Sequence, residues 1–365
     1  MKRSHIATAA GLVLVAALST GCGNGSTGSA SSGSGDGGTD GGTIAFLLKE
    51  NKTARWEMFD RPYFTEALSV QCPACKLLYN NAEQDSAKQQ AQADAALANG
   101  AKVLVITPVD SKASAAIAQK AKAQNVPVIA YDALVQNAPI DFYVSFQNEE
   151  VGKLQGDALV KKLTDDGTIT KGQIVIINGA PTDANAAQFK KGAHTALDGK
   201  VTVGREYDTP DWSPDKAQTQ MQQAITALGK DNIVGVYAAN DGTAGGAVAA
   251  MRSAGFTTIP PLTGQDAELA AIQRIVAGQQ YMTVYKAIKP EATAAATAAV
   301  ALLKGQKPAS NIAVDNGAGQ VPSQLLVPVA VTIDNIKDTL IKDGFYTRDE
   351  ICTAEFVAAC TEAGL

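Results

Sequence analysis

The sequence predicts an α/β protein whose chain forms two lobes, each built around a parallel β-sheet. From Thr43 onward, short apolar runs alternate with amphipathic helical patterns, and this alternation is typical of parallel sheets with right-handed crossovers. The alternation passes through two rounds of similar size, which indicates two similar lobes. The length of 365 residues exceeds that of one ordinary core, and 45% hydrophobic with 18% charged residues is typical of a globular chain.

The clearest strand of the first round is Val126–Tyr131, an apolar run that stops on Asp132. So short a run suits a strand buried on both faces of a parallel sheet. The other elements expected in this round are strand Ile44–Leu48, helix Trp56–Val70, strand Lys76–Tyr79, helix Ala82–Ala98 with Asn99-Gly100 as its C-cap, strand Val103–Thr107, helix Ser111–Gln124 and strand Phe142–Phe146.

The second round follows without a break. Its expected elements are helix Glu149–Leu163, strand Gln173–Asn178, helix Ala184–Ala196, strand Val201–Tyr207, helix Pro214–Leu228, strand Ile233–Ala238, helix Thr243–Ala254, strand Pro261–Gly264, helix Leu269–Ala277 and strand Tyr281–Tyr285. The remaining helix Pro290–Leu303, strand Leu325–Val331 and helix Asn335–Ile341 are too little for a third domain. We therefore expect several crossovers, an amino-terminal lobe of residues 43–146 plus 287–320, and a carboxyl-terminal lobe of residues 147–286 plus 321–365.

The amino terminus has the features of an export signal. Lys2 and Arg3 precede the apolar run Ile6–Leu18, which is followed by small residues and Cys22, and this is the order of a secretory signal. The ending Leu-Ser-Thr-Gly-Cys resembles a bacterial lipobox, whose cysteine is lipid-modified, although Ser19 stands where Leu is usual. An ordinary signal peptide cut near Cys22 is the alternative. A membrane-spanning anchor is disfavoured, because the run is shorter than the ~20 residues needed.

A flexible tether follows the signal. Residues 23–42 are almost entirely Gly, Ser, Thr, Asp and Asn, a composition that cannot bury a core. We therefore assign residues 1–22 to a lipoprotein signal peptide and residues 23–42 to the tether. Together they predict an exported protein that is anchored to the outer face of the cell membrane by lipidated Cys22.

Composition excludes several classes of function. The net charge of −5 and the pI of about 5.2 give no electrostatic argument for nucleic-acid binding. His5 and His194 are the only histidines, and His5 lies in the expected signal. Histidine-dependent triads and multi-histidine metal sites are therefore disfavoured, and we expect no metal, no cofactor and no catalytic residue.

Four cysteines remain beyond Cys22. An even number in an exported protein favours disulfides. Three connectivities are possible, of which we expect the local pairs Cys72–Cys75 and Cys352–Cys360. A thioredoxin-type redox motif at Cys72 is disfavoured, because that motif opens a helix and this one lies between a helix and a strand.

Polar side chains follow five of the expected strands, and we expect them to form a small-molecule pocket. They are Asp132, Asn185, Asn240 with Asp241, Asp266 and Lys286. Ligands of open α/β proteins bind at the carboxyl edge of the sheet, where such residues emerge. Short planar carboxylates and amides can engage two adjacent hydroxyls at once.

Each of the two tryptophans, Trp56 and Trp212, lies in a loop after a strand. The C–H face of a sugar ring stacks on an indole, so one tryptophan from each lobe would sandwich a sugar. Packing of each indole on its own loop is the alternative.

Local structural roles compete with ligand contact at several of these positions. Asp241 is expected to cap the helix that begins at Thr243, and Asn148 to cap the helix after it. Asp60 and Arg61 are expected on a helix surface. Lys286 can be a solvated lysine, although its place directly after a strand favours an inward role. The glycines of residues 242–246 lack the full dinucleotide-binding order.

Several segments resemble the D-xylose-binding proteins of ABC sugar importers, in order and over nearly the whole chain after the tether. These segments are Val128-Ile-Ala-Tyr-Asp132, Asp141-Phe-Tyr-Val-Ser-Phe146, Asn240-Asp-Gly-Thr-Ala-Gly-Gly246, Gly264-Gln-Asp-Ala267, Thr283-Val-Tyr-Lys286 and Asp334-Asn-Ile-Lys-Asp-Thr-Leu-Ile-Lys-Asp-Gly-Phe345. The resemblance implies the type I periplasmic-binding-protein fold, with two Rossmann-like lobes joined by a three-segment hinge. By the same resemblance, the sugar-contacting positions are Arg55, Trp56, Asp132, Asn185, Trp212, Asn240, Asp266 and Lys286. The family has Arg after the aspartate of the Ala-Tyr-Asp motif, whereas this chain has Ala133. This departure implies xylose or a related pentose, hexose or polyol.

We therefore expect a monomeric, non-enzymatic receptor that captures a monosaccharide and delivers it to the transmembrane subunits of an ABC permease. A sugar sensor for a signalling partner is an alternative, and a secreted glycosidase that uses two carboxylates across the cleft is another. A sugar-responsive transcription regulator is disfavoured, because a signal and a tether stand where a helix-turn-helix would be needed.

Overall fold

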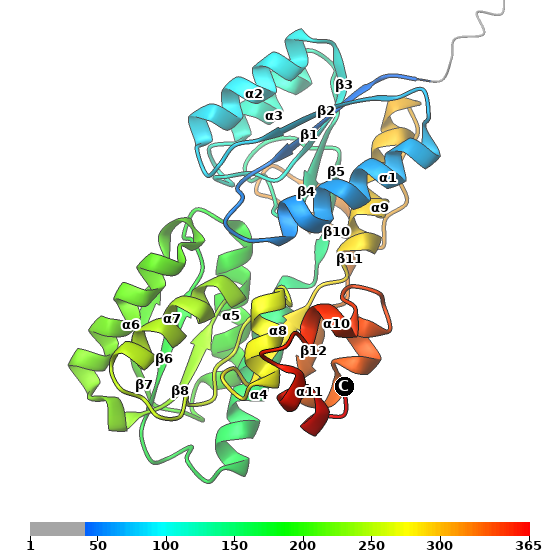
Figure 1. Cartoon of the computed structure of the whole chain (residues 1–365). Coiled ribbons are helices and arrows are strands. Elements are labelled where there is room, and N and C mark those ends of the chain that lie inside the picture. Colours follow the sequence, from blue (N-terminus) through cyan, green and yellow to red (C-terminus); the bar gives the residue numbers. More distant parts are fainter. Residues whose placement is uncertain (1–40) are drawn as a thin grey trace, which may run out of the picture. The chain divides into compact units, whose positions relative to one another are not determined.

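A computed structural model describes residues 41–365, and Figure 1 shows its helices and strands. The expected signal peptide, Cys22 and nearly all of the tether lie outside the described residues. Among residues 41–365, no helix combines the length and the apolar character needed to cross a lipid bilayer.

The first sheet has seven strands in the order β10-β11-β5-β4-β3-β1-β2. These are β1 (Thr43–Leu48), β2 (Lys76–Asn81), β3 (Ala101–Ile106), β4 (Val128–Tyr131), β5 (Phe142–Phe146), β10 (Ile312–Asp315) and β11 (Gln320–Leu326). All neighbours pair in parallel except β10 and β11. The inner strands β1, β3, β4 and β5 are buried almost throughout, as expected for strands covered on both faces.

Helices cover both faces of this first sheet. On one face, α1 (Arg61–Gln71) and α9 (Ile288–Leu303) pack side by side over the sheet and contribute Phe64 and a row of alanines to its core. On the other face lie α2 (Ser86–Ala98) and α3 (Ala115–Ala123). Helix α2 begins at Ser86 and not at the expected Ala82, because Asp85 caps it by accepting hydrogen bonds from the backbone N–H groups of residues 87 and 88.

The second lobe contains β7 (Val203–Asp208), β6 (Gln173–Asn178) and β8 (Ile233–Ala238), paired in parallel in that order. A second, antiparallel pair consists of β9 (Met282–Tyr285) and β12 (Val329–Thr332). Residues 261–266 connect the two groups: Leu262 bridges to β8, and the backbone of Gly264 and Asp266 bonds to Val284 of β9. The segment predicted as strand Pro261–Gly264 thus forms only a single β-bridge, at Leu262, but it lies beside β8, where a further strand of that sheet would lie.

Four helices enclose the β6–β8 sheet. Helices α4 (Asn148–Asp165) and α5 (Ala184–Leu197) pack on one face, and α6 (Pro214–Leu228) and α7 (Asp241–Ser253) pack on the other. Close helix pairs depend on glycine here. A Cβ on Gly152 of α4 would meet the carbonyl oxygen of Phe189 at 1.9 Å, so only glycine permits this approach.

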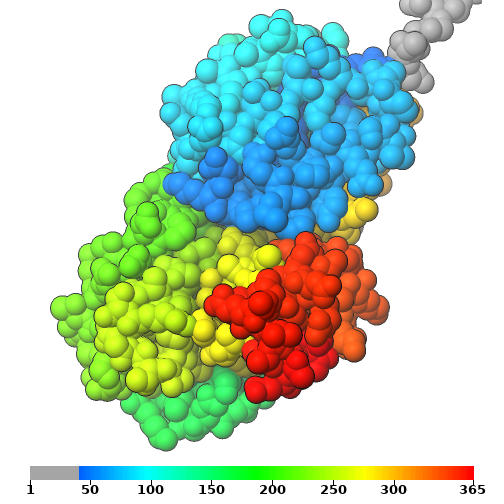
Figure 2. Space-filling view, in the orientation of Figure 1, coloured from blue at the N-terminus to red at the C-terminus, as the bar shows by residue number. Residues whose placement is uncertain are grey.

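The carboxyl-terminal segment packs on α8 (Leu269–Val276) and reaches the first lobe. It includes the π-helical turn η5 (Lys337–Ile341), α10 (Arg348–Ile351) and α11 (Val357–Glu362). Phe345 of this segment stacks on Phe59, which lies in the turn η1 (Trp56–Asp60) that precedes α1, with ring centroids 4.3 Å apart. Figure 2 shows this segment in red against the blue part of the chain.

The chain passes between the two lobes three times, which agrees with the expected three-segment hinge. The passages follow β5, β9 and β11. The expected boundary at residue 320 is wrong for the last passage, because β11 pairs with β5 and so belongs to the first sheet. The predicted strand Leu325–Val331 is in fact the end of β11 and the start of β12. Pro328, which has no N–H to donate, lies in the link between them.

Other differences are smaller. The predicted helix Trp56–Val70 divides into η1 and α1, and β10, α10 and α11 were not predicted. Short turns also occur at η2 (Pro210–Trp212), η3 (Lys230–Asn232) and η4 (Ile333–Asn335). Both expected local disulfides, Cys72–Cys75 and Cys352–Cys360, are present.

Candidate functional site

The eight predicted contact residues line one cavity between the two lobes. The complete lining is Lys49, Glu50, Thr53, Arg55, Trp56, Asp132, Asp183, Asn185, Phe189, Trp212, Asn240, Gln265, Asp266 and Lys286. Six of these, namely Lys49, Glu50, Thr53, Asp183, Phe189 and Gln265, were not singled out from the sequence. Lys49 and Glu50 directly follow β1, and Gln265 directly precedes Asp266. Position at the end of a strand, the signal that identified Asp132 and Asp266, could therefore also have identified these three residues.

Arg55 is held by three carboxylates. Its Nε and Nη2 donate to the two oxygens of Asp60 at 2.9 and 2.7 Å, and Nη2 also donates to Glu291 at 2.8 Å. Its Nη1 donates to Asp132 at 2.8 Å. Four of the five guanidinium hydrogens are therefore engaged, which fixes the direction of the fifth. The expectation that Asp60 lies on a helix surface is wrong, because its side chain is fully buried against Arg55 and Tyr131.

Glu291 lies behind this arginine, on α9. Burial raises the pKa of Glu291 well above its ordinary value, although the charge of Arg55 opposes the change. The carboxylates of Asp132 and Asp60 raise the pKa of Glu291 further, whereas Lys286 lowers it. Burial therefore favours the protonated form of Glu291 more than it does for an exposed glutamate.

Asp132 is the centre of the charges in the cavity. Its Oδ1 lies 3.4 Å from the Nζ of Lys286, and Lys286 also lies 3.1 Å from Asp266. The Nδ2 of Asn185 donates to the other oxygen of Asp132 at 3.1 Å. Burial alone raises the pKa of Asp132, but the charges of Lys286, Arg55 and Lys49 outweigh that effect, so its pKa lies below the ordinary value.

The contact between Asn185 and Asp132 crosses from the second lobe to the first. Asn148 supports it, because its Nδ2 donates to the side-chain oxygen of Asn185 at 3.0 Å and to Ser145 at 3.2 Å. The expectation that Asn148 caps α4 is wrong: it is the first helical residue, and Gln147 occupies the cap position. Asn148 therefore orients a residue of the cavity.

The two indoles flank the same ammonium group. The Nζ of Lys49 lies 5.1 Å from the ring centroid of Trp56 and 6.0 Å from that of Trp212, so the two centroids can be no farther apart than the total of these distances. The indole N–H of Trp56 donates to Glu50, and that of Trp212 donates to Asp183 at 3.1 Å. The polar edge of each ring is thus engaged by the protein. The guanidinium of Arg55 also covers part of Trp56, with its Cζ 4.4 Å from the ring centroid, so a ligand can use the apolar ring surface that remains.

Asn240, and not Asp241 as expected, caps the helix that follows. Asn240 is the N-cap of α7, because its Oδ1 accepts from the backbone N–H of Thr243 at 2.9 Å. Its Nδ2 has no partner among the described residues, and the residue lines the cavity. Asp241 accepts from Gln280 at 2.7 Å instead of capping. Burial raises the pKa of Asp241 to about 7.

Three residues of the cavity have unusual backbone geometry. Asp132, Trp212 and Asp266 have φ values of 60°, 53° and 91°. Positive φ costs a non-glycine residue on the order of 1–2 kcal/mol, and such strain concentrates where function fixes a side-chain direction. The surroundings hold these residues in strained conformations, and all three side chains line the same cavity.

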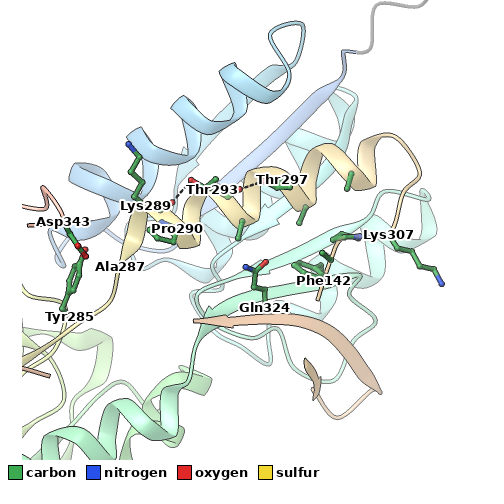
Figure 3. Close-up of a pocket in the computed structure, with 15 residues that line it drawn as sticks. Phe142, Tyr285, Ala287, Lys289, Pro290, Thr293, Thr297, Lys307, Gln324 and Asp343 are labelled. Carbon is green, nitrogen blue, oxygen red and sulfur yellow. Dashed lines mark hydrogen bonds between the residues drawn. The ribbon is translucent and has the colours of Figure 1, made fainter. Parts of the chain in front are cut away.

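The cavity is narrow in this conformation, with about 20 Å³, which is room for a single water molecule. A larger groove of about 770 Å³ lies beside α9 (Figure 3). Its lining is mostly alanine, proline and threonine, and Phe142 of β5 and Gln324 of β11 lie opposite α9. Because no buried charged groups converge there, we place the candidate site in the cavity between the lobes.

Comparison with known proteins gives a consistent picture. Residues 44–307 match the model of the periplasmic binding protein domain. The chain is 37% identical to the D-xylose-binding periplasmic protein of Escherichia coli over 313 residues, which are 84% of this chain and 92% of that protein. It is 38% identical to the D-xylose-binding periplasmic protein of Haemophilus influenzae, covering 84% and 91% of the two chains.

A solved structure is similar over most of its length. It is an ABC transporter solute-binding protein from Clostridium phytofermentans with bound β-D-glucose. The TM-score is 0.79 and the identity 29%, and the match covers 85% of this chain and 99% of the other.

Proposed function

The chain belongs to the periplasmic binding protein family, and from this premise we propose that it captures a monosaccharide between its two lobes for an ABC importer. The family consists of binding proteins and not of enzymes. The observation that carries the proposal is the convergence of Trp56 and Trp212, one from each lobe, on a cavity lined by carboxylates, amides and ammonium groups. Apolar ring faces and planar hydrogen-bonding groups are what a sugar ring and its hydroxyls require.

The polar groups supply both donors and acceptors. Arg55, Lys286 and the Nδ2 of Asn240 are donors, and Asp132 and Asp266 are acceptors. Gln265 adds a further acceptor, because its Oε1 is buried without a hydrogen-bond partner among the described residues. A buried acceptor without a partner costs about 1–3 kcal/mol, so a ligand hydroxyl at this position would be stabilising.

The ligand class is a xylose-like pentose, a hexose or a polyol. Two similar proteins are named for D-xylose and a third holds β-D-glucose, which supports a monosaccharide without selecting one. Ala133 lies next to Asp132 and is buried, but it contributes no side-chain donor. We expect Arg55, Trp56, Asp132, Asn185, Trp212, Asn240, Asp266 and Lys286 to be the sugar contacts.

Binding requires the lobes to move. A cavity of about 20 Å³ does not admit a sugar, so the lobes separate to receive it. Contacts with groups of both lobes then favour the closed form, and a receptor of this kind presents that form to its permease. The three passages of the chain between the lobes are the hinge about which this movement takes place.

We extend the proposal to location. The signal-like residues 1–22, lipidated Cys22 and the tether would hold a monomeric receptor at the outer face of the cell membrane. Metabolic labelling with a radioactive fatty acid tests this: label should appear on the intact protein and disappear in Cys22→Ser. Label on the variant, or none on the intact protein, contradicts the anchor.

Isothermal titration of the protein with xylose, glucose, other pentoses and hexoses, and polyols tests the ligand. We expect one neutral sugar to bind at micromolar concentration or below, and Asp132→Asn to abolish the heat. The substitution Asp157→Asn on the exposed face of α4 is the control and should change nothing. Silence from every sugar in the panel would overturn the proposal.

A further inference from the structure

We propose that Lys49 is a specificity-determining ligand contact, which donates two hydrogen bonds to the sugar while its third N–H stays on Asp183. The proposal rests on the sugar-binding function inferred above. It begins from an unusual position for a lysine. Lys49 follows the buried strand β1, and only 5% of its surface is exposed. Lysine is almost never fully buried unless it is paired.

The ammonium of Lys49 has one hydrogen-bond partner among the described residues. It donates to the Oδ2 of Asp183 at 2.6 Å. An ammonium carries three N–H donors, so two remain, and they lie in the space between the faces of Trp56 and Trp212. The indole rings attract the ammonium by cation–π interaction, but they offer it no conventional hydrogen-bond acceptor. Oxygen atoms of a ligand between the two rings would satisfy the two remaining donors.

The lysine remains charged where it lies. Burial alone lowers the pKa of Lys49, but the carboxylates of Asp183, Asp132 and Glu50 outweigh burial and raise it above the ordinary value. All three of these carboxylates line the cavity. The ammonium therefore keeps its charge, and these carboxylates hold it in the cavity.

Asp183 fixes the lysine to the opposite lobe. Its Oδ1 accepts from the backbone N–H of Asn185 at the start of α5, and its Oδ2 accepts from both Lys49 and the indole of Trp212. The carboxylate is thus held by a helix terminus before the lysine arrives. The position of the ammonium is thus fixed, and with it the directions of the two remaining N–H groups of Lys49. Fixed donor directions allow a contact to distinguish one arrangement of sugar hydroxyls from another.

The test compares Lys49→Met with intact protein in titrations of the best sugar and its monodeoxy analogues. Methionine keeps the length of the side chain and removes the donors. We expect Lys49→Met to bind the parent sugar about 10- to 100-fold more weakly, the value for loss of hydrogen bonds to a charged group. For one or two deoxy analogues the two proteins should bind almost equally, because the missing hydroxyl is the partner of Lys49.

The matched control is Lys52→Met, which removes an exposed ammonium from the same loop. It should leave affinities within twofold. Equal weakening of every sugar and every deoxy analogue by Lys49→Met would assign the lysine to closure of the lobes and overturn the proposal. Unchanged or tighter binding would also overturn it, since Lys49 would then only fill the cavity. If intact protein binds no sugar at all, the proposed function itself fails.

Discussion

Replacement of Asp132 by asparagine tests how the charges beneath the cavity stabilise the fold. The substitution keeps the shape of the side chain and removes its charge. Arg55 at 2.8 Å and Lys286 at 3.4 Å then lose a carboxylate in a region where each side chain is at most 4% exposed. Removing one partner of a buried ion pair costs about 3–5 kcal/mol, and here two buried cations, Arg55 and Lys286, each lose one of their carboxylate partners.

The exposed pair of Lys153 and Asp157 provides the comparison. Its atoms are closer, at 2.6 Å, but the side chains are 45% and 43% exposed, and such pairs are worth about 0–1 kcal/mol. We therefore expect Asp132→Asn to lower the melting temperature of the sugar-free protein by roughly 6–20 °C. Asp157→Asn should lower it by no more than roughly 4 °C.

The pH dependence gives a second readout. The folded pKa of Asp132 lies below its unfolded value of about 3.9. Its contribution to stability is therefore complete above that unfolded value and is lost as the pH falls toward the folded pKa. The difference in unfolding free energy between intact protein and Asp132→Asn should be constant from pH 5 to 7 and shrink below about pH 4. A loss no larger than that of Asp157→Asn, or a difference that does not shrink in acid, would refute the reasoning.

Three further outcomes are expected. A Cβ on Gly179 would lie 2.0 Å from the ring of Trp212 and would displace that ring. Gly179→Ala should therefore weaken sugar binding at least tenfold in calorimetry. Gly245→Ala is the control and should not weaken it, because its Cβ has no contact closer than 3.4 Å. Burial raises the pKa of Asp241 to about 7, so the folded state binds a proton more tightly than the unfolded state and stability falls as the pH rises from about 4 to 7. Urea unfolding of Asp241→Asn should show a smaller fall. An identical dependence of the unfolding free energy on pH in the two proteins would contradict this. Phe345 is 6% exposed, so Phe345→Ala should cost about 3–5 kcal/mol in urea unfolding, and a cost below about 1 kcal/mol would show that the tail does not hold the lobes.

Strand ends were readable from the sequence because buried parallel strands leave a strong pattern. Val128–Tyr131 is apolar at every position and stops on Asp132, and Met282–Tyr285 likewise precedes Lys286. The carboxyl edges of such strands meet in space. Residues that emerge there could therefore be assigned to one pocket without knowledge of their distances.

Contacts between distant segments were not readable. Lys49 faces inward because of Asp183, which is 134 residues away in the chain, and Glu291 reaches Arg55 over 236 residues. No local pattern distinguishes these side chains from solvated ones. Asp60 was misplaced for the same reason.

Neighbouring polar residues at a helix start present a different difficulty. Asn240 and Asp241 are both good caps by composition. Asn240 is the cap, because it forms a reciprocal capping box with Thr243. The side chain of Asp241 is buried and accepts a hydrogen bond from Gln280. The choice depends on a residue of the second lobe that lies 39 positions further along the chain.

The placement of Trp56 and Trp212 has a practical consequence. They are the only tryptophans in the chain, and both line the same cavity. Selectively excited indole emission from this protein therefore arises at the cavity alone, without background from other regions. A change in tryptophan fluorescence on mixing with a candidate sugar therefore indicates a change at the cavity, and the measurement needs no attached dye.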